Sequence, residues 1–248
     1  MSSPASSSSP FRLVIFDLDG TLVDSLPDIA GALNEALAEA GFPLLAPEQV
    51  RAFVGEGAAR LVERALASNA APGGNVNLID AVTGRFRRCY AQRLLVATRP
   101  YPGVEAVLRR LASVVPLAIV TNKPNELARP LLVGLGLAEL FADVMADGDG
   151  FARKPSPDVG RWLLARHGAS PETTLVVGDG VPDMRFARAL AAPAAAVTWG
   201  YVEPDTLRAE RPAWLIDQPA DLLSIVLGTG AHGTGILGTG VPGPGALG

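Results

Sequence analysis

Leu13-Val14-Ile15-Phe16-Asp17-Leu18-Asp19-Gly20-Thr21-Leu22 is the stretch of this 248-residue chain that decides its fold. Its first four residues are apolar, include β-branched and aromatic side chains, and are too few for a helix. They therefore predict a short buried strand. Acidic residues directly after such a strand are typical of an open α/β sheet, in which ligands bind beyond the carboxyl ends of the strands.

The two carboxylates after this strand, Asp17 and Asp19, would repel each other unless a ligand used them. Mg²⁺ binds in proteins through one or two carboxylates together with phosphate oxygens, so Mg²⁺ is the expected cofactor. Gly20 and Thr21 allow a sharp turn and can offer N–H groups to an anion. The alternative interpretation is an ordinary Asp-Gly turn after a strand.

Three further segments repeat the pattern of an apolar run or a turn followed by polar residues. Residues 117–120 precede Thr121-Asn122-Lys123-Pro124, Lys154 stands before Pro155, and residues 174–178 precede Asp179 and Asp183. Taken alone, the Thr121 segment is more typical of a plain strand-end turn, and a lysine before proline is more typical of a solvated side chain. Because the carboxyl ends of parallel strands share one edge, we expect a common crevice there. It would hold Asp17, Asp19, Thr121, Asp179 and Asp183, with Lys154 reaching in.

The periodicity of the rest of the chain predicts two kinds of structure. Residues 24–99 show helical patterning, with one apolar stripe on Ile29, Leu33 and Leu37 and further helices from Pro47, around residues 61–66 and over 79–95. From Tyr101 onward, strand and helix signals alternate, which favours a parallel sheet with helices on both faces. We predict an α/β fold: a doubly wound, Rossmann-like core (11–23 and 100–227) with an inserted all-helical cap (24–99). The cap is either a lid or a stabilising insertion.

Composition sets outer limits on function. Residues 1–10 are Ser/Pro-rich and predict a disordered tail, and residues 228–248 are Gly-rich and predict a flexible one. The net charge of −4 gives no basic footprint for nucleic acid. No apolar run approaches the ~18 residues of a membrane span. A single cysteine fits a reducing compartment, so we expect a cytoplasmic protein that binds neither nucleic acid nor membrane, as a monomer or homodimer.

The motifs resemble those of the haloacid-dehalogenase-like hydrolase superfamily, and within it the phosphoglycolate phosphatase-like branch. The resemblance covers residues 11–227 and rests on residues 16–25, 54–58, 101–104, 121–124, 154–158, 177–179 with Asp183, and 197–201. It implies Mg²⁺ held by Asp17, Asp19, Asp179 and Asp183. It also implies that Asp17 forms an aspartyl-phosphate while Asp19 acts as general acid and then base. Thr121 and Lys154 would bind phosphoryl oxygens. One departure is Gly180, where relatives usually carry serine.

The same resemblance implies a small phosphorylated metabolite as substrate, with 2-phosphoglycolate hydrolysed to glycolate and phosphate. The expected phosphate- or substrate-binding residues are Gly20, Thr21, Asn122, Lys123, Gly55, Gly57, Arg51 and Arg60. The carboxylate of that substrate needs cations or N–H donors, which Arg51, Arg60 and the two cap glycines could supply, with Lys123 as a rival. The alternatives are a sugar-phosphate phosphatase, a phosphotransferase of the hexose-phosphate mutase type, or a non-catalytic binding module.

Overall fold

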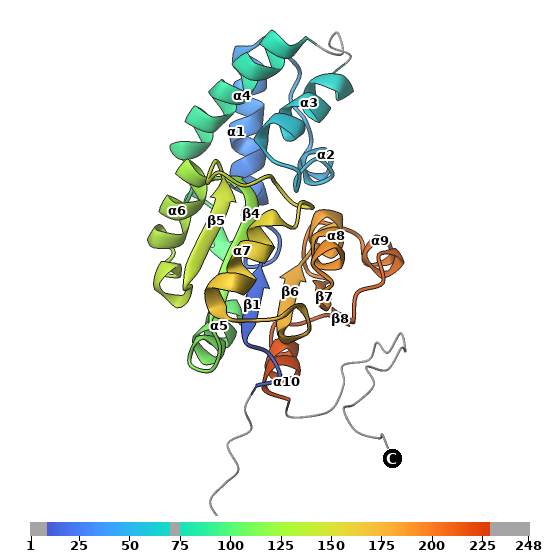
Figure 1. Cartoon of the computed structure of the whole chain (residues 1–248). Helices are drawn as coiled ribbons and strands as arrows, with labels where there is room; N and C mark the ends of the chain where they lie inside the picture. Colours follow the sequence, from blue (N-terminus) through green and yellow to red (C-terminus); the bar gives the residue numbers. More distant parts are fainter. Residues whose placement is uncertain (1–8, 70–74, 229–248) are drawn as a thin grey trace, which may run out of the picture.

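The computed structural model describes residues 9–69 and 75–228, and its centre is a six-stranded parallel sheet (Figure 1). The strands lie in the order β5-β4-β1-β6-β7-β8, so the chain fills one side of the central β1 and then crosses to the other. This confirms the predicted α/β class. The bounds are β1 Leu13–Phe16, β4 Leu117–Pro124, β5 Asp143–Asp147, β6 Thr174–Gly178, β7 Ala194–Val197 and β8 Trp214–Ile216.

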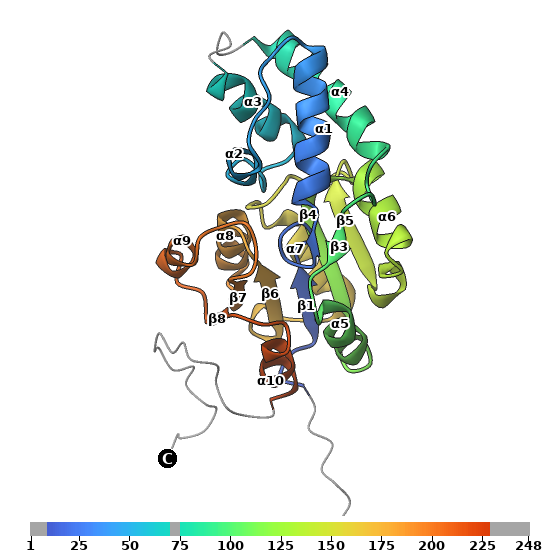
Figure 2. The ribbon, with the colours of Figure 1, turned by 180° about the vertical axis from the view of Figure 1, so that it is seen from behind.

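Helices cover both faces of this sheet because alternate strand residues point to opposite sides. Val14 and Phe16 belong to the core cluster under α5, α6 and α10, whereas Leu13 and Ile15 belong to the one under α7, α8 and α9 (Figures 1 and 2). These helices are α5 Val104–Ala112, α6 Asn125–Gly134, α7 Asp158–His167, α8 Val181–Leu190, α9 Pro204–Ala209 and α10 Asp221–Leu227. Two 3-10 turns, Ala138–Leu140 and Pro171–Thr173, precede β5 and β6.

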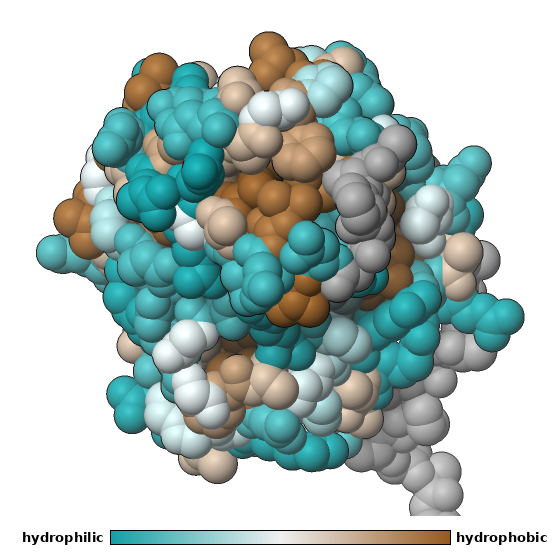
Figure 3. All heavy atoms as spheres, turned by 90° about the horizontal axis from the view of Figure 1, so that it is seen from above, coloured by the Kyte–Doolittle hydropathy of each residue, from teal (hydrophilic) through white to brown (hydrophobic). Residues whose placement is uncertain are grey.

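Four further helices, which we call the cap helices, lie beyond the carboxyl edge of the sheet (Figures 1 and 2). They are α1 Leu26–Glu39, α2 Pro47–Arg51, α3 Ala58–Ser68 and α4 Val76–Ala91. The chain enters them from β2 (Val23–Asp24) and returns through β3 (Arg99–Pro100), and these two strands pair antiparallel. Figure 3 looks onto this end of the molecule, where most of the surface is hydrophilic and some apolar side chains gather near the middle.

The cap helices differ from their predicted bounds mainly at α4, which begins before residue 79 and ends before residue 95. Asn75 starts the helix because its side chain accepts a hydrogen bond from the Leu78 N–H at 3.1 Å. The short β2–β3 pair was not predicted, since two-residue strands show no periodicity. Asp28 reinforces that junction: its buried carboxylate accepts hydrogen bonds from the Ala97 N–H and from the Thr98 N–H and hydroxyl.

The two predicted tails fall mostly on residues 1–8 and 229–248, which lie outside the described residues. Ser9 belongs to the predicted N-terminal tail but is part of the described structure, where its hydroxyl donates to the Val226 carbonyl of α10 at 2.6 Å. Among the described helices, none combines the length and apolarity that crossing a bilayer requires.

Candidate active site

The loop after β1 brings Asp17 against Lys154, which comes from a distant part of the chain. Lys154 Nζ lies 2.6 Å from Asp17 Oδ1 and 2.6 Å from Asp183 Oδ1. The lysine side chain is only 3% exposed. Although burial alone would lower it, the pKa of the Lys154 ammonium is raised by Asp17 and Asp183. Lys154 is therefore a fixed positive charge between two carboxylates.

Asp17, Asp179 and Asp183 form a compact cluster in which one oxygen from each lies within 4.8 Å of the others. Burial, with the nearby carboxylates, raises the pKa of Asp17 to about 7 and that of Asp179 to about 8. The cause is that taking a carboxylate out of water and placing another negative charge beside it both disfavour ionisation. When the carboxylates of the cluster are all ionised, the single positive charge of Lys154 does not neutralise them, so the ionised cluster favours a further cation.

The carboxylate of Asp179 is held on both oxygens and pressed between two glycines. Thr21 Oγ1 donates to Oδ1 at 2.8 Å and the Tyr201 N–H donates to Oδ2 at 2.7 Å. A Cβ atom on Gly20, whose φ is +89°, would lie 2.3 Å from Asp179 Oδ2, and one on Gly200 would lie 2.2 Å from Asp179 Cβ. Only glycine leaves room for the carboxylate at these two positions.

These residues fit the divalent metal that the acidic motifs predict. Carboxylate oxygens are the ligand atoms that Mg²⁺ prefers. The hydrogen bonds from Thr21 and Tyr201 fix the Asp179 carboxylate in place independently of a bound ion. Asp17, Asp179 and Asp183 are the residues whose side chains would hold it.

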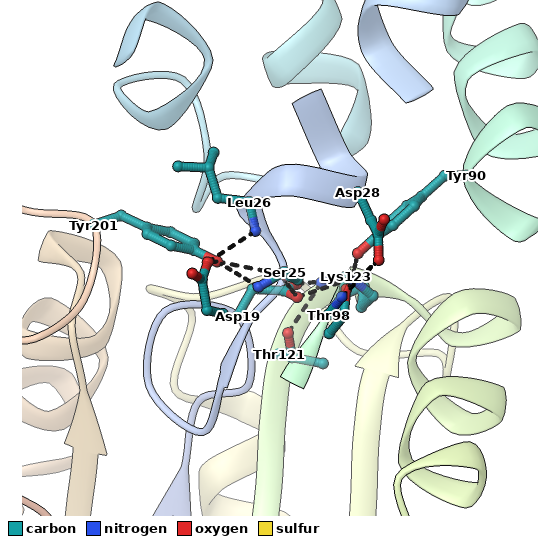
Figure 4. A network of polar contacts seen from close by, with 10 residues as sticks. Asp19, Ser25, Leu26, Asp28, Tyr90, Thr98, Thr121, Lys123 and Tyr201 are labelled. Atoms are coloured by element: carbon teal, nitrogen blue, oxygen red, sulfur yellow. Dashed lines mark hydrogen bonds and ion pairs between the residues drawn. The ribbon is translucent and has the colours of Figure 1, made fainter. Parts of the chain in front are cut away.

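Asp19 lies outside that cluster, between two groups of neighbours that Figure 4 shows on either side of it. On one side Ser25 Oγ donates to Asp19 Oδ1 at 2.5 Å, and the Tyr201 hydroxyl lies 3.2 Å from the same Ser25 oxygen. On the other side Lys123 Nζ lies 2.9 Å from Asp19 Oδ1. Lys123 Nζ also lies 2.6 Å from the Tyr90 hydroxyl, which comes from cap helix α4.

Lys123 is charged despite its burial. Desolvation would lower the pKa of its ammonium, but Asp19 and Tyr90 raise it above the ordinary value. Burial also raises the pKa of Tyr90 to about 12, so this phenol keeps its proton at neutral pH. The pair thus contributes one positive charge and one hydroxyl at the boundary between the cap helices and the sheet.

A pocket of about 480 Å³, including its open mouth, lies between Asp17, Asp19 and the cap helices. Its polar lining includes Thr121, Asn122 and Lys123. Thr121 and Lys123 lie where β4 loses its regular register with β5, an irregularity of the kind that often re-aims side chains near active sites. The remaining walls are mainly apolar and include Ile29, Val54, Ala58, Leu61, Phe86 and Leu127.

Several predicted binding residues have other partners in the structure. The Gly20 N–H donates to the Val23 carbonyl at 2.9 Å, so it does not offer that group to an anion, and the Thr21 hydroxyl serves Asp179. The Asn122 amide contacts the backbone of Lys154 and the Gly55 carbonyl. These contacts fix the positions of Lys154 and of the loop around Gly55, and they occupy the Asn122 amide that was expected to bind phosphate.

The two expected arginines are also placed elsewhere. Arg60 is half exposed on α3 and pairs with Glu63 at 2.5 Å, because these residues are neighbours on one helix face. Arg51 donates to the carbonyls of Gly200 and Tyr201. Neither arginine lines the pocket, whereas Gly55 and Gly57 do.

Gly180 immediately precedes α8 and has a φ of −119°, a backbone conformation open to any residue. Its N–H donates to Asp183 Oδ2 at 3.0 Å, so the loop is held without a serine side chain.

The sequence motifs assign no role to Ser25, Tyr90 or Tyr201, although all three lie near the carboxylates. Ser25 and Tyr201 lie inside the motif segments 16–25 and 197–201, and this position is the signal in the sequence that could indicate a role at the site. Tyr90 shares one face of α4 with Phe86, four residues earlier, and the two rings stack at 5.5 Å. That spacing indicated an apolar face but not its contact with Lys123.

Comparisons with known proteins agree with this geometry. Residues 11–190 match the family model described as haloacid dehalogenase-like hydrolase. The phosphoglycolate phosphatase of Haemophilus influenzae is 37% identical over 220 residues, covering 87% of this chain and 98% of that protein. The phosphoglycolate phosphatase of Pseudomonas syringae pv. syringae is 38% identical over 217 residues, covering 86% of this chain and 78% of its own.

Solved structures show the same similarity in three dimensions. A crystal structure of a predicted phosphoglycolate phosphatase from Haemophilus somnus is 32% identical, with a TM-score of 0.81 over 87% of this chain and 98% of that one. A haloacid dehalogenase-like family protein from Streptococcus pneumoniae is 26% identical, with a TM-score of 0.77 over 87% and 98% of the two chains. With its carboxylates and lysines meeting at the carboxyl edge of the sheet, this chain belongs to the haloacid dehalogenase-like hydrolase family, in its phosphoglycolate phosphatase-like branch.

Proposed function

We propose that this chain is a Mg²⁺-dependent phosphatase that hydrolyses 2-phosphoglycolate to glycolate and phosphate. The observation that carries the proposal is that Asp17, Asp19 and Lys123 face one pocket, while Lys154 contacts Asp17 at its edge. The names of the relatives support the choice of substrate.

In the first step a carboxylate oxygen of Asp17 attacks phosphorus, and the bond from phosphorus to the ester oxygen breaks. Asp19 gives its proton to the departing alkoxide oxygen and is thereby ionised. Ser25 and Lys123 orient Asp19 for this transfer. In the second step Asp19 takes a proton from water, whose oxygen attacks the phosphorus of the aspartyl-phosphate and frees Asp17.

Lys154 and Thr121 are proposed to bind the phosphoryl oxygens. Lys154 keeps its charge beside Asp17, so it opposes the negative charge that gathers on phosphorus in the transition state. Mg²⁺, when bound by Asp17, Asp179 and Asp183 with help from the Asp19 backbone, would supply further charge compensation. Phosphate monoesters are among the slowest substrates to hydrolyse unaided, so both charges are needed.

The substrate carboxylate is proposed to bind Lys123 and backbone N–H groups near Gly55 and Gly57. Lys123 is the cation among the described pocket-lining residues. Its ammonium has three protons, which are directed at the two oxygens of Asp19, at 2.9 and 3.1 Å, and at the Tyr90 hydroxyl, at 2.6 Å. The substrate carboxylate would take over the proton of the longer Asp19 contact. Gly57 lies at the N-terminus of α3 and has no side chain to bond the first N–H groups of that helix, which leaves them for an anion.

The cap helices, with residues 24–99 as proposed bounds, act in this scheme as a lid that keeps water from the intermediate. Because several pocket walls are apolar, hydroxyl-rich sugars find few partners there, which disfavours the sugar-phosphate and mutase alternatives. From composition alone, we further propose a cytoplasmic monomer or homodimer that binds neither nucleic acid nor membrane.

A panel of phosphate esters assayed with Mg²⁺ tests the proposal. We expect 2-phosphoglycolate to give a higher kcat/KM than sugar phosphates, and Lys123→Met to raise KM for 2-phosphoglycolate about 10- to 100-fold more than for p-nitrophenyl phosphate. That range corresponds to one charge-assisted hydrogen bond of about 1.5–3 kcal/mol. Arg60→Ala is the matched control and should change neither KM more than about twofold. Equal effects of Lys123→Met on both substrates would move carboxylate recognition elsewhere, and a requirement for a hexose bisphosphate would indicate a mutase.

A further inference from the structure

Arg51, the last residue of α2, reaches from the cap helices to the loop that follows β7. Its Nε donates to the Tyr201 carbonyl at 2.9 Å and its Nη2 donates to the Gly200 carbonyl at 2.7 Å. Two nitrogens of one guanidinium therefore hold two successive carbonyls, a forked geometry for which arginine is suited.

Tyr201 is in turn connected to both groups of carboxylates, to Asp179 directly and to Asp19 through Ser25. Its N–H donates to Asp179 Oδ2 at 2.7 Å. Its hydroxyl accepts a hydrogen bond from the Ser25 N–H at 2.9 Å, and Ser25 Oγ donates to Asp19 Oδ1 at 2.5 Å (Figure 4). One residue is thus connected to the proposed metal ligand through its backbone and to the proposed general acid through its side chain.

The position of this loop matters because it lies against Asp179. Residues 198–201 belong to no helix or strand, so regular hydrogen bonding does not fix them. Gly200 approaches Asp179 so closely that an added Cβ would lie 2.2 Å from the Asp179 Cβ. Trp199 Nε1 anchors the start of the loop on the Thr21 carbonyl at 3.1 Å, and Arg51 anchors its end.

We propose that Arg51 is a positioning residue that orders Asp179 and Asp19 through Tyr201, and is not a ligand of the substrate. The inference rests on the proposed function, and it links the position of the cap helices to the order of the metal site. When Arg51 is on the loop, the Tyr201 N–H is held on Asp179 and the site is ready for Mg²⁺.

The test measures Mg²⁺ binding by titration calorimetry without substrate, and kcat and KM for 2-phosphoglycolate and p-nitrophenyl phosphate. Arg51→Ala should raise the Mg²⁺ Kd about tenfold, the lower end of the 10- to 100-fold cost of losing partners of metal ligands. Saturating Mg²⁺ should restore part of the lost kcat, and both substrates should be affected alike. Arg51→Lys, which keeps the charge but not the fork, should recover part of the Mg²⁺ affinity.

The matched control is Arg87→Ala, because Arg87 of α4 also spans from the cap helices to the core, where it pairs with Glu126 of α6 at 3.4 Å. We expect it to leave the Mg²⁺ Kd unchanged within twofold. Tyr201→Phe keeps the N–H and the two carbonyls but removes the hydroxyl. It should leave the Mg²⁺ Kd unchanged and lower kcat more for 2-phosphoglycolate, whose leaving group needs a proton, than for p-nitrophenyl phosphate.

Three outcomes would overturn the proposal. An Arg51→Ala variant with wild-type Mg²⁺ affinity and a KM raised for 2-phosphoglycolate alone would make Arg51 a substrate ligand. Equal loss of Mg²⁺ affinity in Arg51→Ala and Arg87→Ala would show that any contact between the cap helices and the core suffices. A Tyr201→Phe variant that loses Mg²⁺ affinity as Arg51→Ala does would contradict the proposal that Arg51 orders Asp179 through the Tyr201 backbone. Inactivity of wild type on all phosphate esters would refute the proposed function instead, while leaving the Mg²⁺ titrations interpretable.

Discussion

Replacing Lys154 with methionine removes a buried positive charge while keeping the length of the side chain. Lys154 Nζ makes two 2.6 Å contacts, with Asp17 and Asp183, and the side chain is 3% exposed. Breaking one buried ion pair by deleting a partner costs about 3–5 kcal/mol of unfolding free energy, because the other charge stays buried and unpaired. For a protein of this size that corresponds to a fall in Tm of about 6–20 °C.

The loss of unfolding free energy in Lys154→Met should be larger at high pH than at low pH. Burial raises the pKa of Asp17 to about 7 even with Lys154 opposing it, so the pKa rises further in Lys154→Met. An acid whose folded pKa exceeds its unfolded value contributes stability at low pH and loses it as pH rises through the folded pKa. The metal-free variant should therefore be destabilised more at pH 8.5 than at pH 5.5, where the unpaired carboxylate can take up a proton.

Activity tests the same charge separately. Removing one electrostatic contact to the transition state costs about 10²–10³ in kcat, so Lys154→Met should be nearly inactive even when saturated with Mg²⁺. Thermal melts in EDTA at the two pH values and steady-state kinetics with p-nitrophenyl phosphate measure both effects. Lys123→Met is the control, since it removes an equally buried ammonium from Asp19 instead of Asp17, and its kcat for this ester should fall less. A kcat within about twofold of wild type, or a loss of Tm independent of pH, would refute the assignment.

Three more predictions concern the metal site and the tail. EDTA should abolish turnover and Mg²⁺ should restore it, and Asp17→Asn or Asp179→Asn should each abolish it; full activity without divalent cation would contradict the site. Because the pKa values of Asp17 and Asp179 are raised to about 7 and 8, ionisation destabilises the metal-free fold as pH rises, so added Mg²⁺ should raise Tm more at pH 8.5 than at pH 6. An equal rise at both pH values would count against this linkage. Deleting residues 229–248, which are Gly-rich and show no core-facing pattern, should leave turnover and Tm nearly unchanged; a fall of many degrees would show that they pack on the body.

The sheet could be predicted from sequence because its strands are buried on both faces. Such strands are continuous apolar runs, as in residues 13–16 and 175–177, and the acidic residues that follow them mark the carboxyl edge. The order of the strands then brings those ends together without any side-chain information. For that reason the positions of Asp17, Asp179 and Lys154 relative to one another follow from short motifs.

The neighbours of those residues could not be predicted in the same way. Whether Arg51 meets a substrate or the Gly200 carbonyl depends on the packing of α2 against a loop 149 residues later in the chain. Arg60 stays on the surface because Glu63 lies one turn away on α3. Tyr90 meets Lys123 only because α4 returns across the pocket. Contacts between segments far apart in sequence carry no periodic signal, so they require the structure.

The two lysines of this chain show why the kind of cation matters at the site. The chain has 21 lysines and arginines, of which only Lys123 and Lys154 are lysines. Both side chains are buried, Lys123 beside Asp19 and Lys154 beside Asp17. One ammonium nitrogen of Lys154 contacts Asp17 and Asp183 at 2.6 Å each, which a compact point charge can do. A planar guanidinium presents its donors as a fork and needs more room. Lys154→Arg should therefore keep the positive charge and still lose most of kcat, and recovery of wild-type kcat would show that charge alone, without the compact geometry, is enough.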